Sequence, residues 1–426
     1  MLKKIRSLLG SNLIQSSSIY TISSIFEKAI PFFLLPILTR YLSTEDYGIV
    51  SMFSVLVGLT IPFVGVNTNS AILRSYYKED IKLSVYITNI FFVLLVSSLF
   101  VAFLFLLIGD TISQYSQFPV EWLYTVFVVA IGQFIINVIL VIWQGEVRPI
   151  PFGIFKVLLT SVNMALAIFL IVGMGYGWKG RVIGKLFAIT IFSIIGLFII
   201  WKKRLYKFRF NKAYIKHALE YGGPLIPHVI SLFSITMIDR FFITNMVGIG
   251  ETGIYTVGYQ VGMIIGVLTG SFNKAWTPWL FDKLNEDSEL VKKKIIKFTY
   301  GYIFAIILIT TGLSIVSPWL MSFFVGKKFY KATQYITWIA FGYAFHGMYL
   351  MVTNYIFYEE KTYLLSWVTF VAALINIVLN YFLITAFGAI GAAQATTVTY
   401  FIQFIITWHM ASRVNKMPWL NAFIQD

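Results

Sequence analysis

Residues 83–109 read LSVYITNIFFVLLVSSLFVAFLFLLIG and contain no charged side chain. A helix needs about 20 apolar residues to cross the roughly 30 Å hydrocarbon core of a bilayer. The strands of a membrane β-barrel instead alternate apolar and polar residues over about ten positions. This continuous run therefore predicts a membrane-spanning α-helix and decides the class of fold.

The same apolar signal recurs along the whole chain. Hydrophobic residues make up 58% of the 426 residues and charged residues only 12%, whereas soluble proteins have about 45–50% and 25%. The sequence therefore predicts an all-α integral membrane protein of about twelve transmembrane helices. The twelve predicted spans are residues 11–39, 47–70, 83–109, 119–143, 150–173, 182–201, 221–245, 252–273, 296–320, 332–357, 362–386 and 389–411.

The placement of lysine and arginine orients these spans. Cytoplasmic loops retain an excess of basic residues, and most of the 33 Lys and Arg fall on the side of the membrane that holds the N-terminus. An even number of spans then places both termini in the cytoplasm. This topology accounts for the net charge of +15 without a nucleic-acid partner, which would need basic residues clustered on a soluble face.

The densest basic run, Lys202 to Lys216, divides the chain in two. The predicted domains are an N-terminal six-helix bundle (1–201), a cytoplasmic basic linker (202–220) and a C-terminal six-helix bundle (221–426). We expect the basic run to lie against anionic lipid, which attracts each basic residue by about 1 kcal/mol.

A short motif recurs after the first helix of each half. Residues 46–49 read DYGI and residues 251–254 read ETGI. We expect each glycine to supply a tight turn before the next helix, with the acidic side chain near the positive N-terminal end of that helix. Two similar six-helix bundles of the same orientation would be parallel repeats that enclose a central cleft.

Two charged pairs lie within predicted spans, where one charge costs about 2.5–3.5 kcal/mol on insertion scales. Glu27 and Lys28 lie near the middle of span one, and Lys28 is either an anion contact on the cleft wall or one half of an interhelical ion pair. Asp239 and Arg240 lie nearer the outer end of span seven, where Arg240 either lines the cleft or anchors the helix by snorkelling to the interface.

Other candidate residues lie near kinks and span ends. Pro224 and Pro227 remove backbone donors and predict a kink or unwound turn in span seven, next to His228, which is either a structural group or a proton carrier. Arg74, at the cytoplasmic end of span two, is suited to bidentate capture of phosphate or is an ordinary basic flank. Lys274 occupies the corresponding place in the second half.

Patterns for catalysis and metal binding are missing from the sequence. It has no cysteine and four histidines, and it contains no H-E-x-x-H and no P-loop. The segments between spans are too short for a soluble catalytic domain. We therefore predict a protein that is not an enzyme, with no catalytic residue, no metal site and no cofactor.

Two motifs resemble the signatures of Wzx-type O-antigen and capsule flippases, in the multidrug/oligosaccharidyl-lipid/polysaccharide exporter superfamily. Residues 40–48, RYLSTEDYG, are similar to the R-x-L-x-x-x-x-[FY]-G pattern at the exit of span one. Residues 221–228, YGGPLIPH, followed by Asp239-Arg240 and by residues 253–255, GIY, resemble the second-half signature. The similarity in span pattern extends over essentially the whole chain.

The resemblance implies a flippase of the bacterial inner membrane that moves an undecaprenyl-diphosphate-linked oligosaccharide from the cytoplasmic to the periplasmic leaflet. Its partners would be this lipid-linked substrate, membrane lipids, a glycan polymerase and other glycan-assembly proteins. Basic cleft residues would hold the diphosphate, and the candidates are Lys28, Arg74, Arg240 and Lys274. Proton or sodium coupling is also implied, and the candidates for coupling or gating are Glu27, Asp239, His228 and Asp46.

Three other functions are compatible with parts of this pattern. A multidrug antiporter of the same superfamily would favour an acidic or apolar cleft for cationic drugs. A membrane glycan polymerase or ligase would normally carry a sizeable periplasmic loop with basic residues, which this chain lacks. A scaffold for glycan-assembly enzymes would not need charges within its spans.

Overall fold

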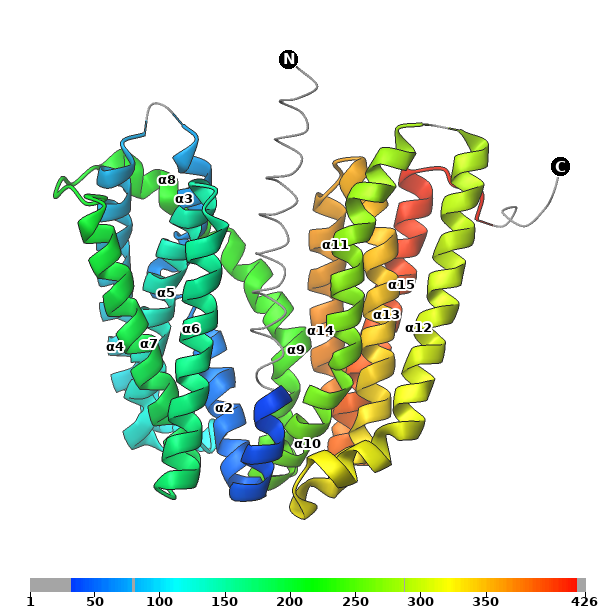
Figure 1. Ribbon diagram of the computed structural model, residues 1–426, viewed down its shortest axis with the longest axis horizontal. Coiled ribbons are helices and arrows are strands. Elements are labelled where there is room, and N and C mark those ends of the chain that lie inside the picture. Colours follow the sequence, from blue (N-terminus) through cyan, green and yellow to red (C-terminus); the bar gives the residue numbers. More distant parts are fainter. Residues whose placement is uncertain (1–31, 79–80, 287, 420–426) are drawn as a thin grey trace. The chain divides into compact units, whose positions relative to one another are not determined.

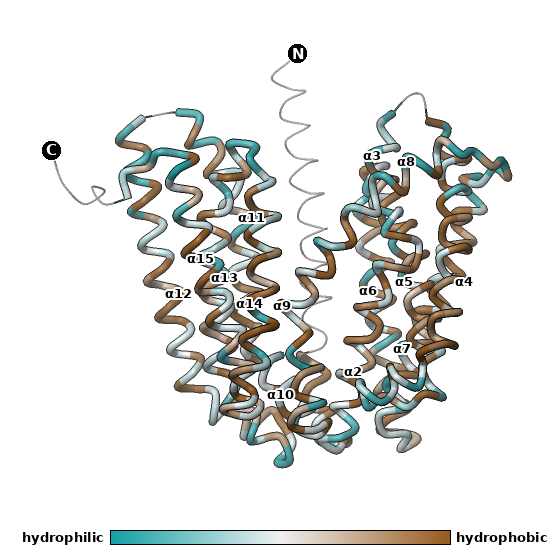
Figure 2. The backbone as a smooth tube through the Cα atoms, turned by 180° about the vertical axis from the view of Figure 1, so that it is seen from behind, coloured by the Kyte–Doolittle hydropathy of each residue, from teal (hydrophilic) through white to brown (hydrophobic). Residues whose placement is uncertain are grey.

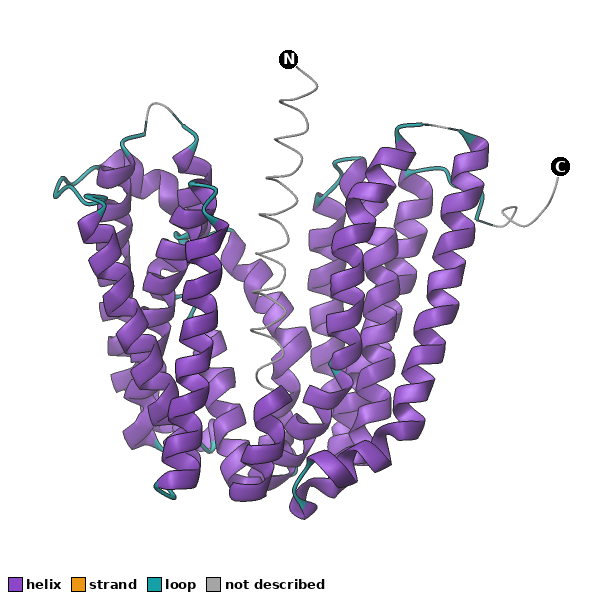
Figure 3. Cartoon of the chain, viewed as in Figure 1, coloured by secondary structure: helices purple, strands orange, loops and turns teal. Residues whose placement is uncertain are grey.

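The structure, a computed structural model, describes residues 32–78, 81–286 and 288–419. These ranges are largely helical and contain no β-strand (Figure 3). The body of α4 (Leu83–Ser116) is strongly hydrophobic, and hydrophilic residues gather at helix ends and in the joining segments (Figure 2). The predicted all-α membrane fold is therefore confirmed.

The chain forms two compact units, unit 1 up to Ile230 and unit 2 from Ser231 (Figure 1). The boundary lies inside one helix, α9 (Leu225–Met246), after the predicted linker. Unit 1 contains helix Phe32–Tyr41, α2 (Thr44–Thr60), η1 (Val64–Asn67), α3 (Ser70–Tyr76), α4, η2 (Val120–Trp122), α5 (Leu123–Gly145), α6 (Pro149–Ile168), η3 (Phe169–Gly173), α7 (Gly177–Lys202) and α8 (Lys212–Gly222). Unit 2 contains α10 (Ile249–Gly262), α11 (Ile264–Leu284), α12 (Glu289–Phe324), η4 (Lys327–Ala332), α13 (Thr333–Tyr358), α14 (Tyr363–Phe387) and α15 (Ala389–Val414).

The helices in the described ranges follow the predicted spans, with two special cases. In the described ranges, nine helices are long and apolar enough to cross a membrane, and a bent pair, α2 with α3, makes a tenth. Helix α13 has the length of a span but is less apolar, because it packs against α10, α11, α12 and α15 and needs fewer lipid-facing side chains. Of the predicted first span, 11–39, only the part from Phe32 lies within the described residues.

Helix α5 is the centre of unit 1. It packs against α2, α3, α4, α6 and α7, and 67% of its most apolar window is buried, compared with 28% for α4 and 17% for α6. Helices α4 and α6 are therefore largely exposed on unit 1. The buried apolar core of the unit extends from Phe53 of α2 to Ala218 of α8.

The second predicted span is broken near its middle. Helices α2 and α3 are bent by 62°, and the backbone at Gly65, Val66 and Asn67 has φ of 73°, 51° and 52°. The N–H of Gly65 donates a hydrogen bond to Ser97 Oγ of α4 (2.8 Å), so part of the freed backbone is satisfied inside the protein, as the membrane requires. The single helix predicted over 47–70 is therefore wrong, because a left-handed β-branched residue leaves no signal in an apolar run.

The basic segment (residues 202–216) is packed onto unit 1. Asn89 of α4 holds it through two hydrogen bonds, since Nδ2 donates to the carbonyl of Arg209 (2.9 Å) and Oδ1 accepts from the N–H of Asn211 (2.9 Å). The side chain of Asn211 also caps α8. This segment, predicted as a linker, is thus a fixed part of unit 1 and positions α8.

The prolines predicted to kink span seven lie at its start. Two residues, Gly223 and Pro224, separate α8 from α9, and Pro227 falls in the first turn of α9, where a missing N–H has no helical partner to lose. The interruption therefore precedes the helix, and α9 continues unbroken to Met246.

The two repeated motifs lie in the first turns of helices, and only the first of them forms a side-chain cap. Ser43 Oγ accepts from the N–H of Asp46 (3.0 Å), and Asp46 Oδ2 accepts from the N–H of Ser43 (3.2 Å), which is a capping box at α2. Glu251 occupies the same third position of α10. The tight turns expected at Gly48 and Gly253 are wrong, because both glycines are buried inside these helices.

Removing the cap of α2 is expected to cost about 0.5–2 kcal/mol of stability. The Ser43→Ala variant loses the acceptor for the N–H of Asp46, so its melting temperature in detergent should fall. Thr44→Ala is the matched control, because the Thr44 hydroxyl bonds only to exposed Glu45. Equal melting temperatures for the two variants would show that the capping box contributes nothing.

Candidate substrate-handling site

Arg74, a predicted phosphate contact, is exposed in the structure and available to an anion. It lies in the last turn of α3 and is exposed, and its guanidinium lies 5.7 Å from the ring centre of Tyr221 in α8. It forms no ion pair within the described ranges. An arginine that stacks on one aromatic ring and has no carboxylate partner keeps its planar donors for a bidentate anion.

Two further cations share one face of α7, near the end of unit 1 opposite to Arg74. Arg181 Nη1 donates to Asn163 Oδ1 of α6 (2.7 Å), and Lys185 Nζ lies 5.3 Å from the ring centre of Phe53. Neither forms an ion pair with a described carboxylate. Four residues apart on a helix, they lie next to each other, and an uncompensated pair of cations inside a span is costly. Arg181 and Lys185 are therefore candidate anion contacts as well.

In unit 2, Asp239 and Arg240 form a buried ion pair. Their side chains are 1% and 4% exposed, and Arg240 Nη1 donates to Asp239 Oδ1 (2.7 Å). The same nitrogen donates to the carbonyl of Thr236 (2.6 Å). Arg240 therefore does not snorkel to the interface, because its charge is compensated within the unit.

A shell of tyrosines encloses this pair. The Tyr255 hydroxyl donates to Asp239 Oδ2, and the Arg240 guanidinium lies 4.1 Å from the ring centre of Tyr259. The hydroxyls of Tyr259 and Tyr343 are hydrogen-bonded to each other (2.8 Å). A charge that faces an aromatic ring gains about 2 kcal/mol or more when desolvated, so the shell stabilises the ion pair where it is.

The other predicted site residues are scattered. Lys274 of α11 and His228 of α9 are exposed, whereas Asp46 is engaged in the capping box of α2. Glu27 and Lys28 lie outside the described residues. Within a single unit, Asp239 and Arg240 are the only two of the described candidate residues that contact each other directly. The roles proposed for all eight candidate residues stay predictions.

Sequence reasoning missed the tyrosine shell and the pair on α7. Tyr255 and Tyr259 follow the ETGI motif at a helical spacing of four. Arg181 and Lys185 have the same spacing. In both cases the i, i+4 spacing on one helix face was the available signal.

The described fold is that of a multi-pass α-helical membrane protein. Two examples among the solved structures with this fold are a transporter and a flippase. An inward-facing multidrug resistance MATE family transporter of the MOP superfamily has a TM-score of 0.73 with 14% identity, covering 92% of this chain and 94% of that one. The lipid II flippase MurJ, in an inward closed conformation, also has a TM-score of 0.73, with 16% identity over 95% and 90% of the two chains.

The chain belongs to the polysaccharide biosynthesis protein family, whose model matches residues 13–284. The MatE family model matches residues 224–382. Two proteins of Haemophilus influenzae are similar along nearly their whole length. An uncharacterized membrane protein is 29% identical, covering 91% of this chain and 92% of its own, and Lsg locus putative protein 1 is 24% identical, covering 94% and 98%. These matches confirm the family that the two sequence motifs indicated.

Proposed function

We propose that this protein is a flippase that carries an undecaprenyl-diphosphate-linked oligosaccharide across the bacterial inner membrane. The observation that carries the proposal is the set of cations in unit 1, Arg74 on one side and Arg181 with Lys185 on the other, which no described carboxylate neutralises. A diphosphate is the anion that such residues would receive at the start and at the end of transport.

The physical task explains the need for a protein. Each unsatisfied polar group of a glycan costs several kcal/mol in hydrocarbon, so the oligosaccharide does not cross unaided. A hydrated cleft in the protein would receive the sugar and the diphosphate, while the lipid chain stays in the bilayer. Transport then needs a substrate that shifts the balance between inward-open and outward-open states.

The buried pair in unit 2 has a separate part in this proposal. Asp239 is a candidate for proton or sodium coupling, because a cation that binds the carboxylate would compete with Arg240 (2.7 Å) and with the hydroxyl of Tyr255. Such competition would link cation binding to the packing of α9 against α10. The chain itself is proposed to perform no chemical reaction and to need no cofactor.

The second candidate function is multidrug antiport. The match of residues 224–382 to the MatE model favours it. Antiport of a cationic drug would need a binding site without positive charge, because Arg74, Arg181 and Lys185 would repel the drug.

A deletion strain distinguishes the two functions. Loss of a flippase should cause lipid-linked oligosaccharide to accumulate in the cytoplasmic leaflet, where an added lectin reaches it only after the membrane is opened. Loss of an antiporter should instead raise drug sensitivity and leave surface glycan unchanged, and that result would end the flippase proposal.

Replacing Arg74 with alanine is expected to reduce glycan export roughly tenfold to a hundredfold, because hydrogen bonds to a charged group contribute about 1.5–3 kcal/mol. Arg74→Lys should recover only part of the export, since it restores the charge but not the planar donor pair. Surface glycan and lipid-linked intermediate would be measured in the complemented deletion strain at matched expression.

Arg148→Ala is the control for the interpretation of Arg74 as an ordinary basic flank. Arg148 lies on the same predicted side of the membrane and is exposed, 3.5 Å from Glu146. If the two variants reduce export equally, Arg74 contributes only to topology and has no specific contact with the diphosphate.

A further inference from the structure

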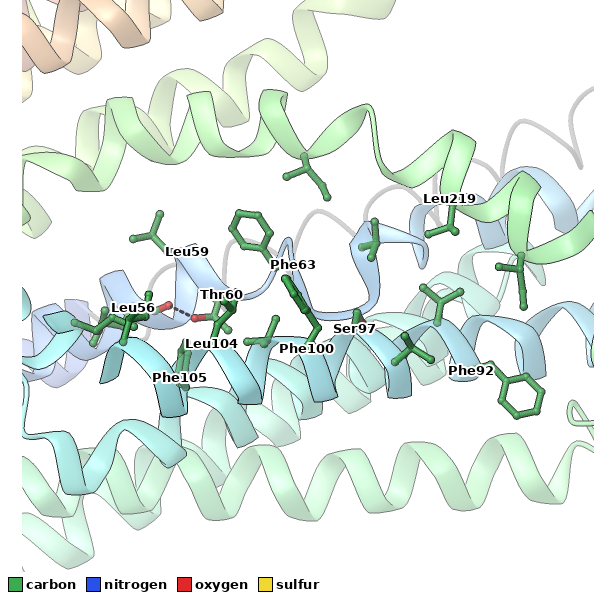
Figure 4. A pocket seen from close by; sticks show the side chains of 18 of the residues that line it. Leu56, Leu59, Thr60, Phe63, Phe92, Ser97, Phe100, Leu104, Phe105 and Leu219 are labelled. Atoms are coloured by element: carbon green, nitrogen blue, oxygen red, sulfur yellow. Dashed lines mark hydrogen bonds between the residues drawn. The ribbon is translucent and has the colours of Figure 1, made fainter. Parts of the chain in front are cut away.

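Unit 1 contains a long apolar groove of about 840 Å³. One wall is formed by α2 and the break after it, the other by α4, and α8 with the residues before it lines one end. Figure 4 shows the labelled side chains one after another along the groove, with Leu56 at one end and Phe92 at the other. Every residue that lines it belongs to unit 1.

The groove offers no hydrogen bond to a ligand. Only two lining residues are polar, Thr60 and Ser97. The Thr60 hydroxyl donates to the carbonyl of Leu56 (2.8 Å). Ser97 Oγ donates to the carbonyl of Leu94 (3.1 Å) and accepts from the N–H of Gly65. With these groups already paired, the molecule that fits the groove is a hydrocarbon chain.

The length of the groove selects among hydrocarbon chains. Its lining extends along α4 from Phe92 to Ile112, which at 1.5 Å per residue is about 30 Å. One leaflet is about half of the roughly 30 Å hydrocarbon core, so the acyl chain of an ordinary phospholipid would fill about half of the groove. A polyprenyl chain that is longer than one leaflet could fill all of it.

The end of the groove at α8 combines apolar and cationic residues. Phe92 packs edge-on against Phe208 (5.3 Å between ring centres) and against Phe210 (6.1 Å). Arg209, between these phenylalanines, is exposed, as is Lys212 at the start of α8. Neither forms an ion pair within the described ranges. An anionic head group would therefore meet positive charge where its chain enters the groove.

From this geometry we infer that the groove binds the polyprenyl chain of a diphosphate-linked lipid, with the diphosphate beside Arg209 and Lys212. The site is a holding position in the same unit as Arg74, which contacts Tyr221 at the other end of α8. The inference rests on the proposed flippase function and adds to it a tail site that is separate from any contact with the sugar. The anchoring of the basic segment to Asn89 (2.9 Å) gives the site a fixed entrance.

Binding to the full-length protein in lipid nanodiscs tests this site. Undecaprenyl diphosphate, farnesyl diphosphate and phosphatidylglycerol would be offered separately, and retention would be measured by native mass spectrometry. We expect the long chain to bind at least tenfold more tightly than the other two. Val96→Trp, on the α4 wall of the groove, should reduce binding of the long chain at least tenfold, and Arg209→Ala should weaken it severalfold.

Matched variants control for folding and for charge. Leu99→Trp places the same ring on α4 at an exposed position outside the groove lining, and Lys202→Ala removes a basic residue at the end of α7; both should bind as the wild type does. Equal retention of phosphatidylglycerol would overturn the inference and make the groove a site for bulk lipid. Undiminished binding in Val96→Trp would overturn it as well.

The chain's own first span is the other possible occupant. Because the protein has no native cysteine, Ile22→Cys can be combined with Val96→Cys and oxidised. An efficient disulfide would place the first span in the groove and exclude the lipid chain, whereas no cross-link together with long-chain binding supports the inference.

Export separates a failure of this site from a failure of the proposed function. If Val96→Trp keeps full export and binding while the deletion strain accumulates lipid-linked oligosaccharide, the tail site is refuted and the flippase function stands. If the deletion strain does not accumulate lipid-linked oligosaccharide in the cytoplasmic leaflet, the proposed flippase function is refuted, whatever the groove binds.

Discussion

Replacing Arg240 with leucine is expected to destabilise the protein by about 3–5 kcal/mol, the range found when one partner of a buried ion pair is removed. The arginine donates to Asp239 (2.7 Å) and to the carbonyl of Thr236 (2.6 Å). Without it, the carboxylate stays buried with the hydroxyl of Tyr255 as its remaining side-chain donor, and the Tyr259 ring loses the cation that it faces. The melting temperature in detergent and the fraction of monodisperse protein should both fall.

The double variant Asp239→Leu/Arg240→Leu gives this prediction its control. Removing both charges removes the cost of the orphaned carboxylate, and apolar replacements of buried pairs are often neutral or stabilising. The double variant should therefore recover most of the lost stability. If it recovers stability but not export, the pair acts in coupling; if it recovers both, the pair is an anchor. A single variant as stable as the wild type would mean that Asp239 is not buried as the structure shows.

Substituting Gly222 with alanine is expected to cost about 1–3 kcal/mol or more, because overpacking in a tightly packed place forces the backbone to shift. A β-carbon there would lie 2.5 Å from the carbonyl oxygen of Val66 and 3.0 Å from the backbone of Asn67. Neither neighbour is a side chain that can rotate away. The variant should separate α8 from the break in span two and should reduce both thermal stability and glycan export.

Gly301→Ala in α12 is the matched substitution for Gly222→Ala. Nothing lies within 4 Å of the position that its β-carbon would take, and replacing glycine in a helix interior by alanine favours the helix by about 0.8–1.0 kcal/mol. It should therefore melt at the wild-type temperature or slightly above. If Gly222→Ala has the same melting temperature as Gly301→Ala, the backbone at Gly222 does not contact the backbone at Val66 and Asn67.

Hydropathy was enough to predict where the chain crosses the membrane, but it did not predict helix ends or breaks. The predicted span 83–109 and α4 begin at the same residue, yet α4 continues to Ser116, because a helix can extend into the polar interface where apolar composition stops. The break at Val66 was not predicted, because its strain depends on contacts with α4 and α8. Helix α13 was predicted over 332–357 by the same scan for apolar runs, although its packing makes it the least obvious span.

Some residues of the candidate site were singled out from the sequence, but Arg181, Lys185 and the surroundings of the site were not. The expense of charge within a span identified Asp239 and Arg240, and the positive flank of span two identified Arg74. The sequence did not show that Tyr343, far along the chain, completes the shell around Arg240, because such neighbours are set by tertiary packing. Lys28 lies outside the described residues, and its role stays a prediction.

The passage from unit 1 to unit 2 within α9 has a consequence for any transport cycle. A flexible loop at Ile230 and Ser231 would free up to four N–H and four carbonyl groups at the two new helix ends, and hydrocarbon could satisfy none of them. The continuous helix avoids that cost, but it also leaves no flexible hinge at this point of the chain. Any motion of one unit relative to the other must therefore bend or rotate α9 as a whole.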